Sequence, residues 1–282
     1  MQPVVGGYEV ETFLRPGRFG DLWRARRPDG SIVELKLLKP ELFKDGEAIR
    51  RFQREVRLML EFEHPYLLRV LDHGTTSGGD PYLVLEHKEG KLLSQVVHDG
   101  ALPVERVRKI GAQVARVLAA AATRGIVHRG LCPEAILLCA ATDDVRVLDF
   151  GLALAGQVDE DGEEPRLTEV GQRVGDPTYM APEYVEDFRS DARTDLYTLG
   201  VVLYELLTGD PPFTGRPMEV LDAHVSTEPT APSTSRSEVP RWLDELVLAL
   251  LRKDPQTRPE ATAVARALVA GTWPPPEAGA SS

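Results

Sequence analysis

Three stretches of the chain carry side chains whose types suit phosphate chemistry. Residues 128–138 read HRGLCPEAILL, the segment around Asp149 reads VLDFGLA, and Lys36 closes the stretch VELK. Phosphoryl transfer uses cations to pair phosphate oxygens, and carboxylates to hold Mg²⁺ or to accept a proton. A lone lysine or aspartate is a weak signal for that chemistry, so the secondary structure around each residue decides how it is interpreted.

Alternating and apolar runs predict secondary structure along the whole chain. Strands are expected over 8–15, 21–28, 31–39, 67–72 and 81–86. Helices are expected over 47–63, 103–124, 242–251 and 261–270, and the longest apolar run is 196–207. A loop rich in Pro, Ser and Thr is expected over 227–240. The sequence therefore predicts an N-terminal strand region followed by a helical remainder.

The composition restricts the classes of partner and compartment. The chain has 282 residues, 42% of them hydrophobic, and a formal net charge of −11. That charge disfavours duplex nucleic acid and anionic membranes, since both reward clustered Lys and Arg. The N-terminus lacks the pattern of a signal peptide, and the longest apolar run is shorter than the ~20 residues of a membrane span. With only Cys132 and Cys139, which have no metal-binding spacing, we expect a soluble cytoplasmic protein.

In order along the chain, these motifs resemble those of the protein kinase family. Residues 128–138 resemble the catalytic loop HRDLKPEN, VELK resembles VAIK, Asp149 begins a DFG motif, and residues 181–183 read APE. The resemblance covers roughly residues 8–270 and is closest to the bacterial eukaryotic-like (Hanks-type) Ser/Thr protein kinases.

The resemblance implies an α+β, bilobal protein kinase-like fold. The expected divisions are a β-rich N-lobe with its hinge over 1–90, a mainly helical C-lobe over 91–271, and a disordered Pro-rich tail over 272–282. Residues 190–213 resemble the central buried helix of this fold and are apolar nearly all round, and there Asp195 should bond the catalytic-loop backbone. His128 should be buried. Glu183 should form an ion pair with Arg258.

The resemblance also implies a set of nucleotide-binding residues. They are Gly17, Gly20, Lys36, Glu55, Glu86, Lys88, Leu137 and Asp149. Glu55 would pair with Lys36, and Asp149 would bind Mg²⁺. The two glycines are a weak signal by themselves, because an ordinary hairpin turn also favours glycine.

The catalytic loop departs from the family at three positions. Gly130 replaces the Asp that accepts the substrate proton, Cys132 replaces the Lys that pairs the moving phosphate, and Ala135 replaces the Asn that binds Mg²⁺. The chain contains no asparagine at all, so none can substitute from another position. The loop therefore keeps the residues that pack and lacks the residues that react.

Two exchanges in the strand region bear on nucleotide binding. Arg15 replaces the first glycine of the glycine-rich loop and cannot take a positive φ cheaply. Glu34 replaces the alanine of VAIK, where a carboxylate would be desolvated against the adenine ring. The alternative is that Glu34 turns out to solvent or pairs with Arg15. We expect absent or weak binding of ATP.

Asp176 stands where the family has the threonine of a GTP motif, which normally contacts the catalytic Asp and Lys. Two interpretations remain open. Either these positions have drifted together, or the carboxylate lost at position 130 has moved to Asp176. Removal of the other acid would favour the second, because two close carboxylates resist ionising together.

These departures favour a pseudokinase, which would not be an enzyme. It would be a protein-binding regulator or scaffold in kinase signalling, with an active kinase or its substrate as the partner, and ATP and Mg²⁺ would bind weakly. The alternatives are a slow or atypical ATP-dependent Ser/Thr phosphotransferase with Asp176 as a relocated acid, and a nucleotide-binding switch without turnover.

Overall fold

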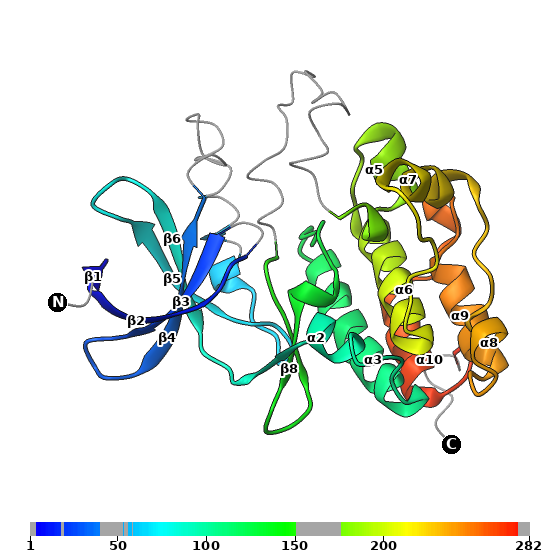
Figure 1. The fold of residues 1–282 in the computed structure, drawn as a ribbon, viewed down its shortest axis with the longest axis horizontal. Coiled ribbons are helices and arrows are strands. Elements are labelled where there is room, and N and C mark those ends of the chain that lie inside the picture. Colours follow the sequence, from blue (N-terminus) through cyan, green and yellow to red (C-terminus); the bar gives the residue numbers. More distant parts are fainter. Residues whose placement is uncertain are drawn as a thin grey trace. The chain divides into compact units, whose positions relative to one another are not determined.

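The structure is a computed structural model that describes residues 4–17, 20–39, 53, 56–57, 59–150 and 176–275. The chain divides into two compact units. The first unit takes the described residues up to 89 together with Phe150, and the second takes residues 90–149 and 176–275. Strands dominate the first unit and helices the second (Figure 1).

The first unit is built on a six-stranded sheet with the strand order β1-β2-β3-β4-β6-β5, in which all neighbours are antiparallel. Its strands are β1 (Val4–Val5), β2 (Tyr8–Arg15), β3 (Gly20–Arg26), β4 (Ile32–Leu38), β5 (Val70–Thr75) and β6 (Pro81–Glu86). Five of these strands were predicted. The predicted start of β5 at residue 67 is wrong, because the buried Leu67 and Leu68 lie before the strand and extend its apolar run.

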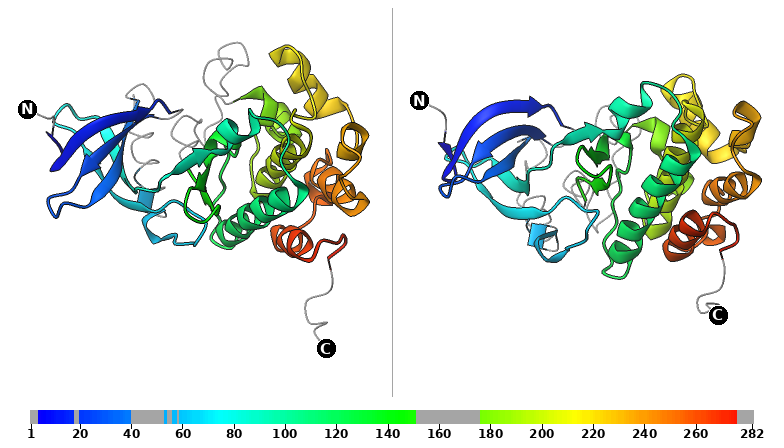
Figure 2. Two further views of the ribbon diagram at one scale, coloured as in Figure 1. Left: turned by 60° about the horizontal axis from the view of Figure 1, so that its bottom comes forward. Right: turned by 90° about the horizontal axis from the view of Figure 1, so that it is seen from below.

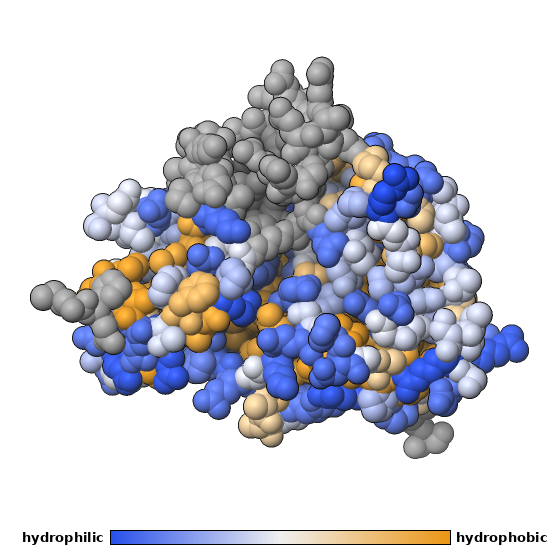
Figure 3. All heavy atoms as spheres, in the orientation of Figure 1, coloured by the Kyte–Doolittle hydropathy of each residue, from blue (hydrophilic) through white to orange (hydrophobic). Residues whose placement is uncertain are grey.

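The alternation along β4 separates its side chains onto two faces of the sheet. Leu35 lies in register with Trp23 and Val84 and belongs to an apolar cluster. Glu34 and Lys36 therefore point to the opposite face. Apolar residues also reach the surface of this unit (Figure 3), where Val4, Phe13 and Leu14 are exposed.

Only part of the helix predicted over 47–63 lies within the described residues. Residues 53, 56–57 and 59–61 are helical, and both Val56 and Met59 are buried, as the apolar spacing predicts. Glu55 lies outside the described residues.

The second unit is mainly helical and carries a small sheet. Its α-helices are α2 (Leu93–Val97), α3 (Val104–Ala122), α5 (Pro182–Asp187), α6 (Ala192–Thr208), α7 (Pro217–Ser226), α8 (Pro232–Ser235), α9 (Arg241–Leu250) and α10 (Ala261–Ala270). Its short 3₁₀ turns are η2 (Pro133–Ala135), η4 (Pro177–Tyr179) and η5 (Pro255–Thr257). The sheet has the order β7 (Gly90–Leu92), β8 (Ile136–Cys139), β9 (Val145–Val147).

The predicted helices of this unit are confirmed as α3, α6, α9 and α10. The loop predicted over 227–240 is wrong in part, because α8 forms within it. Pro232 begins that helix, where its fixed φ suits the first turn and its missing N–H costs nothing. The small sheet and helices α2, α5 and α7 were not predicted, because such short segments show no clear periodicity.

Helix α6 forms the core of the second unit. Its side chains are buried on nearly every face, and it contacts both α3 and α9 (Figure 2). A Cβ atom on Gly200 would lie 2.8 Å from the Leu250 side chain, so glycine here lets α9 approach closely. Asp191 caps the first turn, and Gly209 ends the helix in the left-handed conformation. Helix α6 is therefore a fixed base for the side chains that it carries.

Candidate active site

Lys36 lies in the interior of the first unit, at the centre of its sheet. Its side chain is fully buried, and strand pairing places it between Leu22 and Leu83. A buried ammonium group requires an acceptor or a counter-charge. Its predicted partner, Glu55, lies outside the described residues, so the Lys36–Glu55 pair stays a prediction.

Glu34 shares the sheet face of Lys36 and is also buried, with 7% of its surface exposed. The alternative that it turns out to solvent is therefore wrong. Its Oε1 lies 3.0 Å from Nδ1 of His87, the residue between Glu86 and Lys88. No short-range pattern in the sequence predicts this contact, because it joins β4 to the segment just after β6, 53 residues along the chain. A pair with Arg15 stays a prediction.

Gly17 and Gly20 are needed for the backbone of the first hairpin. A Cβ atom on Gly17 would lie 2.4 Å from the carbonyl oxygen of Gly20, and one on Gly20 would lie 2.3 Å from that of Leu37. Arg15 pairs with Leu22 at the end of β2, and its φ is not positive. The predicted strain at Arg15 is therefore absent. The glycines are explained by close backbone approach alone, and their role toward a nucleotide stays a prediction.

The predicted hinge residues bond to one another and to a neighbouring loop. Lys88 Nζ lies 3.2 Å from Glu86 Oε2, and Glu86 Oε1 accepts a hydrogen bond from the Arg69 backbone N–H. The backbone of Glu86 in turn donates to the Arg69 carbonyl. The predicted roles of Glu86 and Lys88 in nucleotide binding remain untested.

The catalytic-loop backbone is fixed by a carboxylate of α6. Asp195 accepts hydrogen bonds from the backbone N–H of His128 at 2.7 Å and of Arg129 at 2.9 Å. His128 is 1% exposed, and its Nε2 lies 2.8 Å from the Leu148 carbonyl oxygen. The predictions for His128 and Asp195 are confirmed. Burial raises the pKa of Asp195 to about 7. The hydrogen bonds from the two N–H groups favour the ionised form and partly oppose this rise.

The exchanged loop residues lie beside this fixed backbone. The Gly130 N–H donates to His128 Nδ1, Cys132 is half-buried at the start of η2, and Ala135 is buried. The Ala135 carbonyl accepts from the backbone N–H of Leu148, one residue before Asp149. Leu137 is half-buried in β8 and pairs with Arg146 of β9. The loop therefore positions Asp149 through backbone groups, whatever the side chains at 130, 132 and 135.

Two residues of this region have a left-handed backbone although neither is glycine. Arg129 has φ 62° and Asp149 has φ 60°. Such conformations cost of order 1–3 kcal/mol and persist only where the surroundings impose them, often at functional sites. The Arg129 N–H donates to Asp195, and the Leu148 N–H, one residue before Asp149, donates to the Ala135 carbonyl. Hydrogen bonds therefore hold the backbone at or next to both residues.

Asp176 is the cap of η4. Its Oδ1 accepts a hydrogen bond from the Thr178 N–H at 2.9 Å, just as Asp254 caps η5 through the N–H of Gln256. Asp176 therefore has a local structural role as a helix cap. Neither interpretation of Asp176 from the sequence predicted this role. It is an exposed residue, so its carboxylate also remains accessible to other groups.

An acidic cluster surrounds Asp176. Tyr179 donates to Glu205 Oε2 at 2.7 Å. Burial raises the pKa values of both Tyr179 and Glu205, and the negative charges of Asp176 and Glu134 raise them further. Asp176 thus acts electrostatically on the same groups as Glu134 of the catalytic loop.

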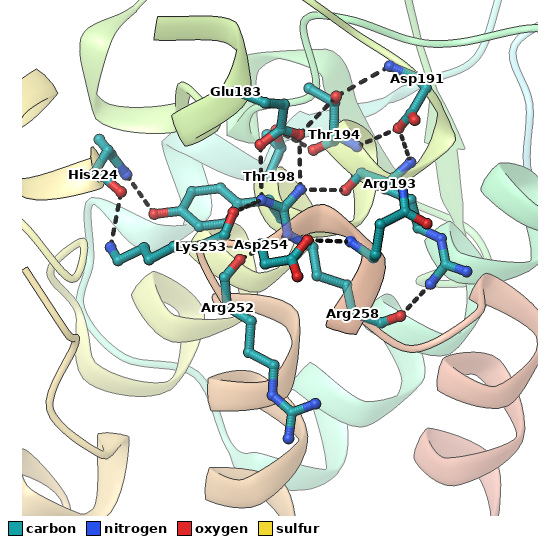
Figure 4. Close-up of polar contacts among 12 residues, drawn as sticks. Glu183, Asp191, Arg193, Thr194, Thr198, His224, Arg252, Lys253, Asp254 and Arg258 are labelled. Atoms are coloured by element: carbon teal, nitrogen blue, oxygen red, sulfur yellow. Dashed lines mark hydrogen bonds and ion pairs between the residues drawn. The ribbon is translucent and has the colours of Figure 1, made fainter. Parts of the chain in front are cut away.

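The predicted ion pair between Glu183 and Arg258 is confirmed (Figure 4). Both carboxylate oxygens accept from the guanidinium, each at 2.7 Å. Thr194 Oγ1 adds a third hydrogen bond to Glu183. Arg258 also donates to the carbonyls of Arg193, Arg252 and Lys253, so the pair ties three segments of the second unit together.

Comparison with known proteins decides the family. The sequence model described as "Protein kinase domain" matches residues 8–269. The chain belongs to the protein kinase family. Serine/threonine-protein kinase PknB of Mycobacterium leprae is 36% identical over 253 residues, 87% of this chain and 40% of that protein. PkaA of Streptomyces coelicolor is 36% identical over 284 residues, 95% of this chain and 50% of that protein.

Solved structures support the same conclusion. The crystal structure of the PknI kinase domain of Mycobacterium tuberculosis matches with a TM-score of 0.74 and 25% identity, covering 95% of this chain and 97% of that one. The prediction of a bilobal, α+β protein kinase-like fold is confirmed. This kinase chain spans half or less of the length of the two curated relatives.

The prediction that the chain is not an enzyme is contradicted by these relatives. They are named serine/threonine-protein kinases, and they match this chain over most of its length, including the catalytic loop. The exchanges at positions 130, 132 and 135 are differences in side chain, and by themselves they do not show that activity is lost.

A protein kinase normally uses ATP and Mg²⁺, and one residue here suits the metal. Mg²⁺ prefers hard oxygen ligands and is usually held by one or two carboxylates, with phosphates and waters completing its shell. Asp149 offers such a carboxylate on a fixed backbone, and Ala135 cannot ligate. Among the residues that the structure describes, no cluster of three or more His, Cys, Asp or Glu suits a metal, and no helix is long and apolar enough to span a membrane.

Proposed function

We propose that this kinase transfers the terminal phosphoryl group of ATP to Ser or Thr hydroxyls of proteins, slowly and without the usual catalytic-loop side chains. The observation that carries the proposal is the hydrogen-bonded frame of Asp195, His128 and Leu148, which holds the backbone before Asp149. Its relatives, named Ser/Thr protein kinases, support the same reaction.

Two retained residues and the exchanged Asp176 each have a defined part in the proposed reaction. Lys36 would pair phosphate oxygens of the nucleotide, and Asp149 would hold Mg²⁺, which supplies charge neutralisation on the phosphates when bound. Asp176 would accept the proton of the attacking hydroxyl, since the usual base is replaced by Gly130. Its single bond to the Thr178 N–H leaves the second carboxylate oxygen available for that proton.

The reaction should be slow for a definable reason. Loss of a positioned general base costs on the order of 10²–10⁴ in rate. Cys132 and Ala135 supply neither the cation nor the second metal ligand, so charge on the moving phosphoryl group is less well neutralised. The effects of residues that act together do not simply multiply.

The acidic cluster favours a cationic protein substrate. The pKa of Glu205 is raised by burial and by the negative charges of Glu134 and Asp176. A Lys or Arg side chain of an acceptor peptide would relieve that repulsion. Basic peptides are therefore the first substrates to test.

A second role is compatible with slow catalysis. The kinase would also regulate a protein partner, such as another kinase or its substrate, through binding. The specific feature that favours this role is that three residues on which the family relies for catalysis are exchanged while the loop backbone stays fixed.

The test is transfer of radiolabelled phosphate from ATP to a basic protein and to the kinase itself. The unmodified chain should transfer label above the level of Lys36→Met and Asp149→Asn. Asp176→Asn should reduce transfer by about 10²-fold or more, because asparagine can cap η4 but cannot accept the proton. Asp254→Asn is the matched control, because Asp254 caps the 3₁₀ turn η5 in the same way, and it should leave transfer unchanged. Label in the unmodified chain no higher than in Lys36→Met would overturn the proposal.

A further inference from the structure

Helix α7 contributes a fully buried histidine whose two ring nitrogens both have partners. Nε2 of His224 lies 2.9 Å from the Thr178 carbonyl oxygen, and Nδ1 lies 2.8 Å from the Tyr197 hydroxyl. A carbonyl can only accept, so Nε2 carries the hydrogen and donates. Burial lowers the pKa of His224 to about 4, so the ring is neutral near pH 7 and Nδ1 accepts from the Tyr197 hydroxyl. The two contacts then fit a single tautomer, with its hydrogen on Nε2.

The packing around His224 holds the ring in that orientation. The Phe213 ring lies edge-on to it, with centroids 5.0 Å apart. Lys253 Nζ donates to the carbonyl of His224 (Figure 4). It also donates to the carbonyl of Ala223 and lies 4.8 Å from the centroid of the Phe213 ring. The ring is therefore enclosed by side chains from several segments, and a nearby ammonium group opposes its protonation.

The residue that His224 bonds is the one that also bonds Asp176. The Thr178 N–H donates to the Asp176 carboxylate, and its carbonyl accepts from His224. The next residue, Tyr179, bonds through its carbonyl to Thr198 and through its hydroxyl to Glu205, both on α6. The turn η4 is thus held from α6 through its last residue and from α7 through its middle residue.

We infer that His224 is a positioning residue that sets the place of the Asp176 carboxylate. Helix α6 fixes the catalytic-loop backbone through Asp195 and orients His224 through Tyr197. The same helix therefore supports both the catalytic loop and the turn η4 that carries Asp176. The structural part of this inference stands on the contacts alone, whereas its effect on phosphotransfer rests on the proposed function.

Four variants test the inference. His224→Leu removes both ring bonds, and His224→Gln keeps one donor and one acceptor on a side chain that cannot be protonated. Tyr197→Phe removes the hydroxyl that orients the ring. Tyr204→Phe is the matched control, because it removes a buried α6 hydroxyl that bonds Thr230 instead.

The first measurement is amide hydrogen exchange of the peptide that contains 178–180. Exchange should accelerate about tenfold or more in His224→Leu, the order expected when a buried carbonyl loses its donor. Tyr197→Phe should accelerate it to a smaller extent, and His224→Gln and Tyr204→Phe should leave it near the unmodified rate. Unchanged exchange in both His224→Leu and Tyr197→Phe overturns the inference. If His224→Leu does not fold, the single variants Tyr197→Phe and His224→Gln are compared instead. Exchange no faster in Tyr197→Phe than in His224→Gln then overturns the inference.

The second measurement is steady-state transfer to a basic peptide. In His224→Leu the peptide KM should rise, or kcat should fall, by about tenfold, while the KM for ATP stays unchanged. In His224→Gln both constants should return to those of the unmodified chain. An equal change in the KM for ATP would indicate a general structural role and overturn the inference. If the unmodified chain transfers no label, the proposed function fails while hydrogen exchange still decides the role of His224.

Discussion

Arg258 and Glu183, 75 residues apart in the chain, bind through two parallel hydrogen bonds of 2.7 Å. The Arg258 side chain is 0% exposed and that of Glu183 is 13% exposed. Because both charges are removed from water, each depends on the other for compensation. An exposed ion pair between the same two residue types would contribute little to the free energy of unfolding.

Arg258→Ala should therefore destabilise the fold severely. Removing one partner leaves Glu183 as an uncompensated buried charge, which costs roughly 3–5 kcal/mol in the free energy of unfolding. Urea denaturation measures this loss. Arg241→Ala is the control, because Arg241 pairs with Glu245 while 91% of its side chain is exposed, and it should change the free energy by under about 0.5 kcal/mol. A similar small effect for Arg258→Ala would contradict the role of burial.

His224 should make stability fall in mildly acidic solution. Burial lowers its pKa from 6.5 to about 4, so between these values the unfolded chain binds a proton that the folded chain does not. The free energy of unfolding should decrease as pH falls through this window, by up to roughly 3 kcal/mol for this group. The charged or titratable groups near His224 and its partners are Tyr197 of α6, Lys253, Arg258, Glu183 and Glu228.

The difference between the unmodified chain and His224→Gln isolates this effect. Burial raises the pKa of Asp195 to about 7, which gives a contribution of opposite sign that both proteins share. Urea denaturation from pH 7.5 to 4.5 should give a steeper loss for the unmodified chain. Parallel curves would show that His224 does not titrate as described.

Glu34→Ala should strengthen the binding of ATP with Mg²⁺. A buried carboxylate bonded to His87 occupies the face of β4 where the family places adenine, and a nucleotide must displace or desolvate it. We expect weak binding in the unmodified chain and a Kd about tenfold lower in the variant, equivalent to about 1.4 kcal/mol. The shift of the melting temperature with ATP concentration measures it.

Glu11→Ala is the control for charge, since Glu11 of β2 pairs with Arg24 and Arg26 instead. Equal melting shifts for the unmodified chain and Glu34→Ala would mean that Glu34 does not limit nucleotide binding.

Gly130→Asp alone should not speed phosphotransfer. In the family the residue at position 176 contacts the one at position 130, so we expect the new carboxylate to approach Asp176, and two close carboxylates resist ionising together. It also restores neither the cation nor the second Mg²⁺ ligand. The combined variant Gly130→Asp, Cys132→Lys, Ala135→Asn and Asp176→Thr should raise kcat by about 10²-fold or more. Radiolabel transfer measures both, and an increase from Gly130→Asp alone would rule out Asp176 as the working base.

Much of the fold and part of the site follow from sequence. Strand alternation and helical periodicity predicted β2, β3, β4, α3, α9 and α10, because side-chain burial repeats with the period of each element. Helix α6 is buried on nearly every face, and the family resemblance predicted it instead. The resemblance in residues 128–138 predicted the buried His128 and its support by Asp195. The sequence also contained the capping role of Asp176, since Asp-Pro-Thr and Asp-Pro-Gln form the same local turn.

Only the tertiary structure decided the remaining contacts. Glu34 and His87 are 53 residues apart, and His224 and Thr178 are 46 apart, so no short-range pattern connects them. Each partner is selected by what the packed elements bring within hydrogen-bond reach, because a buried polar group must find a partner wherever the fold offers one. The sequence by itself determined the kinase frame and its exchanged residues. Tertiary packing decided which side chains hold that frame in place.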